Sequence, residues 1–286
     1  MKSTVERLEG ILSNVAGRLA KLILVLKPVW QPKDHGPVVF ICPDYRWPAL
    51  SAEQHAERIE ILRTYEPASE IANQLMRRVP DDLRDRQASA DQAIRKWIDF
   101  HENWSLTARP DANEAAMRAS VDEAVAILKL LNNVGDQGTV LIPDTNALLK
   151  ECDPTKYRAI TDQLPFTFLL LPTVLAELDK LKVEHRNADV RDKAEAAVRR
   201  IKGWRNQGSL RTGVTVDKTI IVRADHIEPN MESTLSWLDR TNADDRIVAN
   251  VIATQAAHPA ARVVLVTHDI NLQNKADAAL IEVAEL

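Results

Sequence analysis

Four acidic residues stand where predicted segments of structure begin or end. Asp144 follows the apolar run "VLIP", Asp269 follows "VVLVTH", Glu177 lies one turn into the helix after "FLLLP", and Asp244 begins a late helix. The carboxyl ends of parallel strands meet at one edge of a sheet, so we expect these side chains to converge. Gathered carboxylates repel one another unless a cation neutralises them, and hard oxygen ligands suit Mg²⁺ or Mn²⁺. The pattern predicts a divalent metal site.

Each acid also has an ordinary interpretation when it is taken alone. Aspartates after strands serve as turn residues or helix N-caps, and acids in a first helical turn are favoured by the helix dipole. Other acidic pockets on parallel sheets fit the residues poorly. Asp144-Thr145-Asn146 lacks the second acid of the Asp-x-Asp motif of haloacid-dehalogenase-type phosphotransferases, and the Asp-x-Ser-x-Ser motif of von Willebrand-type metal sites is absent.

The elements that must position these acids form the second half of the chain. From about residue 138, continuous apolar runs alternate with helical segments, which is typical of an α/β domain with a mainly parallel sheet. Residues 51–133 read as mostly helical, residues 3–26 as an amphipathic helix and residues 36–48 as a short strand. Gly135 and Gly138 indicate a linker, so we expect a helical region of unknown role over 1–135 and the α/β domain over 136–286.

Bulk properties set the outer limits of the interpretation. The 286 residues are 45% hydrophobic and carry a formal net charge of −4, so a nucleic-acid-binding surface would have to be a local patch. Cys42 and Cys152 match no zinc or redox spacing, which favours a reducing compartment. No run is long and apolar enough to cross a bilayer. We therefore expect a cytoplasmic protein with no membrane partner.

Four motifs, taken in order, resemble those of PIN-domain nucleases. They are "VLIPDTNALL", "LLLPTVLAELDKLK", "NADDRIVANVI" and "VVLVTHDINLQNKA". The most similar subgroup has a Glu-Leu-Asp-x-Leu-Lys second motif and a Thr-x-Asp-x-Asn-Leu fourth motif. The resemblance covers residues 138–286, so it implies a PIN-like fold for this half of the chain only.

The resemblance also implies a role for each matching position. Asp144, Glu177, Asp244 and Asp269 would be the four metal-binding acids, and Asp244 is preferred to Asp245 because Ile247 stands three residues further on. Asp245 would then support the metal ligands without binding the metal itself, or compensate the helix dipole. Asn146 would orient Asp144 or a metal-bound water, and Thr267 would form a hydrogen bond within the cluster. Lys275 would anchor the fourth motif through an ion pair, with a solvated lysine as the alternative.

By the same resemblance, the protein is expected to be a metal-dependent ribonuclease. Mg²⁺ or Mn²⁺ would activate water and offset charge on the phosphate during phosphodiester hydrolysis. Such enzymes act as toxins, RNA-processing enzymes or defence effectors. The alternatives are a structure-specific DNA nuclease and a non-catalytic RNA-binding or scaffold protein with a structural metal. A protein partner or a second copy of the chain would bind through the helical region.

Residues 180–211 are the most basic part of the chain. This segment, interpreted as part of the helix after the second motif, has ten basic residues against four acidic ones. Phosphate neutralisation dominates nucleic-acid affinity, so the segment is the best candidate for contacts with an RNA backbone. Trp204 would stack on a base beside it. A charged, solvated helix with a packed tryptophan is the alternative.

Overall fold

The computed structural model describes residues 2–30, 45–101, 106–161 and 163–286. The chain forms two compact units, one of residues 5–132 and one of residues 133–286 together with Met1–Thr4. Most of the strand expected over 36–48, including Cys42, lies outside the described residues. Its described end forms strand β2 (Tyr45–Arg46), which pairs antiparallel with β1 (Val29–Trp30).

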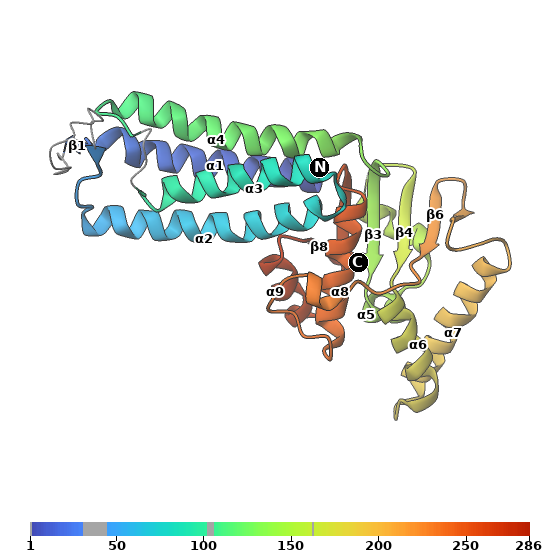
Figure 1. Cartoon of the computed structure of the whole chain (residues 1–286). Helices are drawn as coiled ribbons and strands as arrows, with labels where there is room; N and C mark the ends of the chain where they lie inside the picture. The colour runs from blue at the N-terminus through green and yellow to red at the C-terminus, as the bar shows by residue number, and fades with distance from the viewer. Residues whose placement is uncertain (1, 31–44, 102–105, 162) are drawn as a thin grey trace. The chain divides into compact units, whose positions relative to one another are not determined.

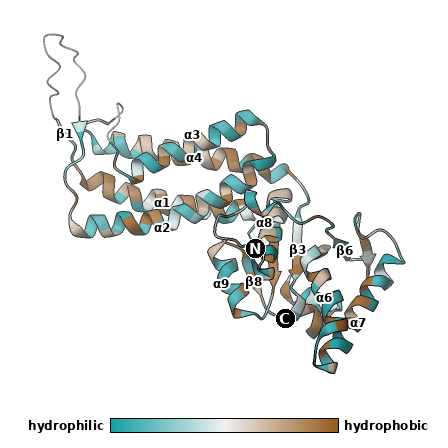
Figure 2. Ribbon diagram, turned by 60° about the horizontal axis from the view of Figure 1, so that its bottom comes forward, coloured by the Kyte–Doolittle hydropathy of each residue, from teal (hydrophilic) through white to brown (hydrophobic). Residues whose placement is uncertain are grey.

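The first unit is mostly helical, as the sequence predicts. Its long helices run side by side (Figure 1) and are α1 (Thr4–Val25), α2 (Ala52–Leu75), α3 (Asp81–Ile98) and α4 (Pro110–Leu130). Ser51 begins α2 with a capping box, in which its hydroxyl accepts from the Gln54 N–H and the Gln54 side chain accepts from the Ser51 N–H. Hydrophobic and hydrophilic residues alternate along these helices (Figure 2), as expected for helices that each bury one face.

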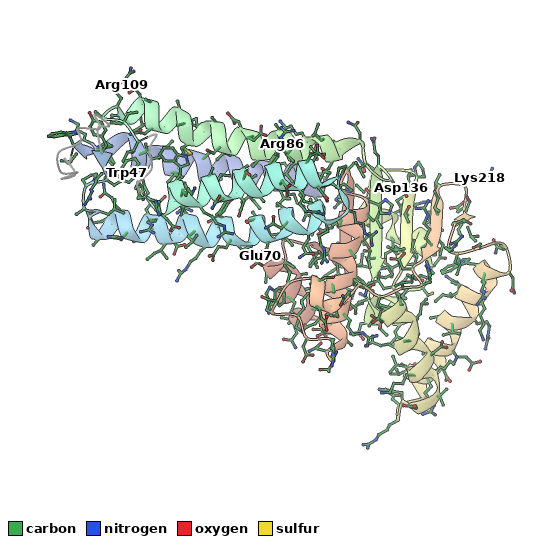
Figure 3. All side chains as sticks on the ribbon, in the orientation of Figure 1. Trp47, Glu70, Arg86, Arg109, Asp136 and Lys218 are labelled. Atoms are coloured by element: carbon green, nitrogen blue, oxygen red, sulfur yellow. The ribbon has the colours of Figure 1, made fainter. Side chains whose placement is uncertain are left out.

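Ion pairs between neighbouring helices show the order in which they pack. Arg18 on α1 pairs with Glu57 on α2 at 2.7 Å, and Lys129 on α4 pairs with Glu9 on α1 at 2.7 Å. Arg86 on α3 (Figure 3) pairs with Glu123 on α4, also at 2.7 Å. These pairs are partly exposed, so they contribute less to stability than to the choice of neighbour.

A polar network joins α2 to α3 inside this unit. Asp91 accepts hydrogen bonds from the Tyr65 hydroxyl at 2.6 Å and from the Ser69 hydroxyl at 2.5 Å, and Arg95 Nε binds its other oxygen at 3.0 Å. The Arg95 guanidinium also lies over the Tyr65 ring, 5.4 Å from the centroid. Buried polar groups are costly when unpaired, so this network fixes one alignment of the two helices.

The second unit is built on a six-stranded sheet with the order β5-β6-β4-β3-β7-β8. All neighbouring strands are parallel except β5 and β6, which confirms the predicted mainly parallel sheet. Its strands are β3 (Gly138–Pro143), β4 (Phe166–Leu170), β5 (Val214–Val216), β6 (Ile220–Ala224), β7 (Ala261–Val266) and β8 (Glu282–Ala284). The central β3 and β7 form because their apolar runs are buried on both faces.

Helices connect the strands and carry the predicted site residues. They are α5 (Thr145–Lys150), α6 (Pro172–Glu184), α7 (Ala188–Arg205), α8 (Ala243–Ala257) and α9 (Ile270–Ala278), with 3₁₀ turns at Pro154–Ile160 and Met231–Ser233. The basic segment is two helices rather than part of one, which corrects the prediction. The chain leaves α6 at His185, and the Asn187 side chain caps α7 by accepting from the Asp189 N–H at 2.9 Å. Within the described ranges, no helix is long and apolar enough to span a membrane.

Candidate active site

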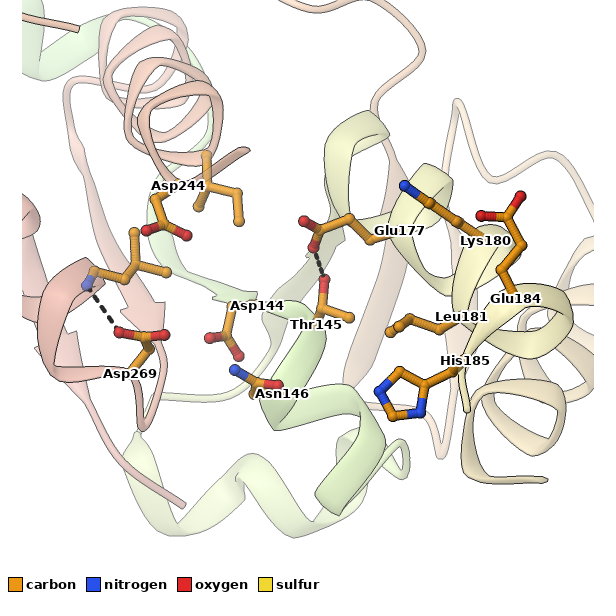
Figure 4. A pocket seen from close by; sticks show the side chains of 12 residues that line it. Asp144, Thr145, Asn146, Glu177, Lys180, Leu181, Glu184, His185, Asp244 and Asp269 are labelled. Atoms are coloured by element: carbon orange, nitrogen blue, oxygen red, sulfur yellow. Dashed lines mark hydrogen bonds between the residues drawn. The ribbon is translucent and has the colours of Figure 1, made fainter. Parts of the chain in front are cut away.

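The four predicted acids come together in one pocket of the second unit. Asp144, Glu177, Asp244 and Asp269 all line a pocket of about 450 Å³ at the carboxyl edge of the sheet. Figure 4 shows Asp244 and Asp269 on one side, the α6 residues on the other, and Asp144 between them. The prediction that these residues converge therefore agrees with the geometry of the structure.

Strand register sets the position of Asp144. Pro143 at the end of β3 pairs with Val266 at the end of β7, so Asp144 and Thr267 lie side by side. The Thr267 hydroxyl donates to Asp144 Oδ2 at 2.5 Å, and Asp144 Oδ1 caps α5 by accepting from the Ala147 N–H at 2.6 Å. Burial raises the pKa of Asp144 above the ordinary 3.8; these two hydrogen bonds oppose the rise.

Asp269 is linked to Asp144 through the same threonine. Its backbone N–H donates to the Thr267 hydroxyl at 2.9 Å, while its carboxylate caps α9 by accepting from the Asn271 N–H at 2.8 Å. Thr267 is fully buried. One hydroxyl thus fixes the spacing of two acids at the ends of adjacent strands.

Glu177 faces these acids from α6. The Thr145 hydroxyl at the start of α5 donates to Glu177 Oε2, which ties the two helices together. Lys180, Glu184 and His185 continue the same side of the pocket (Figure 4). The Asn187 N–H lies 3.2 Å from Nδ1 of His185, a contact that holds the ring at the end of α6.

The adjacent aspartates at the start of α8 face different surroundings. Asp244 lines the pocket, whereas the Asp245 carboxylate is buried and accepts from the Asp239 N–H at 2.8 Å. Lys275 on α9 contacts both, with Nζ 2.7 Å from Asp245 Oδ1 and 3.3 Å from Asp244 Oδ2. Lys275 therefore forms an ion pair and is not a solvated lysine.

The donor set fits a hard divalent cation, because carboxylate oxygens from four chain segments face one pocket. In the part of the chain that the structure describes, however, no three His, Cys, Asp or Glu side chains are grouped closely enough to hold one ion. Two of the acids have partners within the protein, since Thr145 binds Glu177 and Lys275 binds Asp244. Metal binding would draw these carboxylates away from their present partners.

Sequence reasoning missed the residues that support the acids. Thr145 belongs to the first motif but was assigned no role, and its contact with Glu177 crosses between segments. Arg246 on α8 binds Glu228 at 3.0 Å, and Glu228 also accepts from the Thr173 hydroxyl on α6 at 3.0 Å. This bridge joins the helices that carry Glu177 and Asp244, and no sequence pattern indicates it.

Asn146 and Trp204, two other residues given roles from the sequence, lie in different surroundings. Asn146 lines the pocket with an exposed side chain, while the two oxygens of Asp144 are already bound by Thr267 and the Ala147 N–H. Trp204 is buried, 6% exposed, and packs edge-on against Phe168 with ring centroids 6.4 Å apart. The base-stacking prediction for Trp204 is therefore wrong, because the side chain belongs to the core under α7.

Comparison with known families agrees with this geometry. A family model described as a PIN domain matches residues 141–286, just over half of the chain. The chain belongs to the PIN-domain family. PIN domains are in general nucleases, which are hydrolases, and they typically use divalent metal ions. The match confirms the resemblance of the C-terminal half. No curated protein matches the chain.

Proposed function

We propose that this PIN-domain protein is a metal-dependent endoribonuclease with its nuclease domain in residues 136–286. The observation that carries the proposal is the gathering of four acids from four chain segments in one pocket. Asp144, Glu177, Asp244 and Asp269 would hold Mg²⁺ or Mn²⁺, with Asp245 supporting Asp244. The bound cation would supply an activated water and offset negative charge on the phosphate.

The protein's own residues would prepare this site. Thr267 fixes the separation of Asp144 and Asp269, and Thr145 aims Glu177 from α6. Asn146, exposed at the pocket wall, is placed to bind a water or a phosphate oxygen. Lys180 adds a positive charge on the α6 side, where a phosphate would approach.

The basic segment supports a nucleic-acid substrate, although part of its charge is already neutralised. Lys182, Lys193, Arg199 and Arg200 form ion pairs with Asp179, Asp189, Glu195 and Asp153. We assign the backbone contacts to five exposed cations, namely Lys180, Arg186, Lys202, Arg205 and Arg211. RNA is preferred to DNA because of the subgroup that the motifs resemble. The helical region would direct the nuclease or bind a partner. The cysteines match no zinc or redox spacing, which favours the cytoplasm as the cellular location.

The test is cleavage of matched single-stranded RNA and DNA oligonucleotides by the purified full chain in Mn²⁺, Mg²⁺ or EDTA. We expect RNA cleavage that needs a divalent ion and is lost in Asp144→Asn and Asp269→Asn. Asp277→Asn is the matched control, because Asp277 is exposed on α9 and lies outside the pocket. Cleavage of DNA alone would identify a DNA nuclease. Cleavage that persists in both variants would contradict the proposed site.

A further inference from the structure

Lys275 lies within the acid cluster although it is outside the pocket lining. Its ammonium group touches Asp245 Oδ1 at 2.7 Å and Asp244 Oδ2 at 3.3 Å, and its side chain is only 26% exposed. The contact joins α9, which follows Asp269, to the first turn of α8. Lys275 is therefore a third positively charged group of the site region, beside Lys180 and Arg246. It directly contacts the pocket acid Asp244 and its neighbour Asp245.

The two aspartates differ in how completely they are engaged. Asp245 binds Lys275 through Oδ1 and the Asp239 N–H through Oδ2, and its side chain is 8% exposed. The Asp244 side chain is 35% exposed and reaches both Lys275 and the pocket. Asp245 is thus a fixed partner of the lysine, while Asp244 is shared between the lysine and anything bound in the pocket.

Lys275 brings a positive charge to the α8 side of the cluster, because its Nζ lies between Asp245 Oδ1 and Asp244 Oδ2. A two-ion nuclease site needs a second cation held by shared carboxylates about 3.5–4 Å from the first. On the α8 side of the cluster, the ammonium already neutralises the carboxylates that such an ion would use.

We propose that Lys275 is a positioning residue whose ammonium group serves as a permanent cation of the acid cluster. It neutralises Asp245 and competes for Asp244, so that the pocket takes one exchangeable divalent ion rather than two. This inference rests on the proposed metal-dependent function and specifies the ion count and the residue that limits it. Binding of the ion and the Lys275–Asp244 contact oppose each other, so each weakens the other by the same factor.

The experiment is a calorimetric titration of the full chain with Mn²⁺, compared with thermal unfolding in EDTA and in Mn²⁺. We expect wild type to bind one Mn²⁺ per chain. Lys275→Met should bind Mn²⁺ about tenfold more tightly and take up a second ion, since the charge that competed for Asp244 has been removed. In EDTA, Lys275→Met should unfold at a lower temperature because Asp245 has lost its counter-ion, and Mn²⁺ should raise its Tm more than that of wild type.

Two further variants separate charge from shape. Lys275→Arg keeps the positive charge and should retain an affinity near that of wild type. Lys129→Met is the matched control, because Lys129 makes an ion pair of the same 2.7 Å length with Glu9 in the helical unit. Its removal should leave Mn²⁺ binding unchanged. If Lys275→Met does not fold, Asp245→Asn/Lys275→Met removes both charges together and should also bind Mn²⁺ more tightly than wild type.

The outcomes distinguish this inference from the proposed function. Two Mn²⁺ ions per wild-type chain, or equal or weaker binding by the foldable Lys275 variant, would overturn the inference and leave the metal-dependent site intact. Absence of Mn²⁺ binding by wild type, or binding unaffected by Asp144→Asn, would overturn the proposed metal site itself, and the role of Lys275 with it.

Discussion

Asp144 occupies a position that is unfavourable for a charged side chain. Its side chain is buried, 3% exposed, and burial raises the pKa of the carboxyl group, with the charge of Asp269 adding to the effect. Thr267 and the Ala147 N–H offset part of this. Retaining a carboxylate here is consistent with a role in binding rather than in stability.

The sign of this pKa shift gives a prediction for Asp144→Asn. A pKa raised above the ordinary 3.8 contributes stability below that pH, and the contribution is lost as pH rises through the folded-state pKa. Asparagine caps a helix as well as aspartate does and carries no charge. In EDTA at pH 7 we expect the variant to unfold at the same or a higher temperature than wild type. Thermal denaturation followed by circular dichroism checks this.

Two further measurements complete that comparison. The difference in Tm between the variant and wild type should shrink as pH is lowered, because protonation removes the buried charge of wild-type Asp144. Mn²⁺ should stabilise wild type and leave the variant unaffected. A clear loss of stability at pH 7 would show that the carboxylate itself stabilises the fold, through its hydrogen bonds from Thr267 and the Ala147 N–H.

At this scale the sequence predicts the acids better than their partners. Asp144 and Asp269 could be found because both follow buried strands whose ends must meet. The Lys275 contact with Asp245 and the Thr145 contact with Glu177 join helices far apart in the chain, and side-chain packing alone fixes them. For the same reason the sequence leaves Trp204 open between base stacking and core packing, since only the packed structure shows that it faces Phe168.

At the scale of elements, the end of α8 is tied to the beginning of β3 by a histidine. The Asp136 N–H donates to Nδ1 of His258 at 3.0 Å, and Asp136 (Figure 3) also forms an ion pair with Arg223 on β6. Burial lowers the pKa of His258 below the ordinary 6.5, although the charge of Asp136 opposes this. A protonated Nδ1 could not accept the hydrogen bond.

This arrangement predicts destabilisation by mild acid. A lowered histidine pKa contributes stability above about 6.5, and that contribution is lost as pH falls towards the folded-state pKa. Between pH 7.5 and 5.5 we therefore expect wild type to lose more stability than His258→Gln, which does not titrate. Urea unfolding at the two pH values measures the difference. His55→Gln, at an exposed position on α2, should behave as wild type.

Element boundaries also show where sequence reasoning was incomplete. The predicted apolar strands β3 and β7 are confirmed because continuous burial leaves a clear pattern. The break between α6 and α7 was missed because charged residues continue across it. The residues Asn187 and Asp189 do form an N-cap and an acidic first turn, so the signal was present but was outweighed by the basic composition.

At the scale of the whole molecule, each unit has its own buried core and its own polar network. We therefore expect two unfolding transitions in calorimetry. Asp91→Ala should lower the free energy of unfolding of the helical unit by about 1.5–3 kcal/mol. The reason is that the Asp91 carboxylate loses its hydrogen bonds with Tyr65, Ser69 and Arg95. Asp85→Ala, an exposed acid on the same helix, is the control. A single transition shifted as a whole would contradict independent units.

The first turn of α8 has a consequence for insertions and deletions. Asn242 caps this helix, accepting from the Asp244 N–H at 2.9 Å, and thereby fixes where the helix begins. Successive helical residues point about 100° apart. One residue gained or lost between Asn242 and Asp245 would rotate the two aspartate side chains. Asp244 would then no longer line the pocket, and Asp245 would no longer face Lys275. The exposed stretch at His226 and Ile227 should tolerate changes in length much more readily, because neither the Glu228 bridge nor the Asn242 cap lies within it.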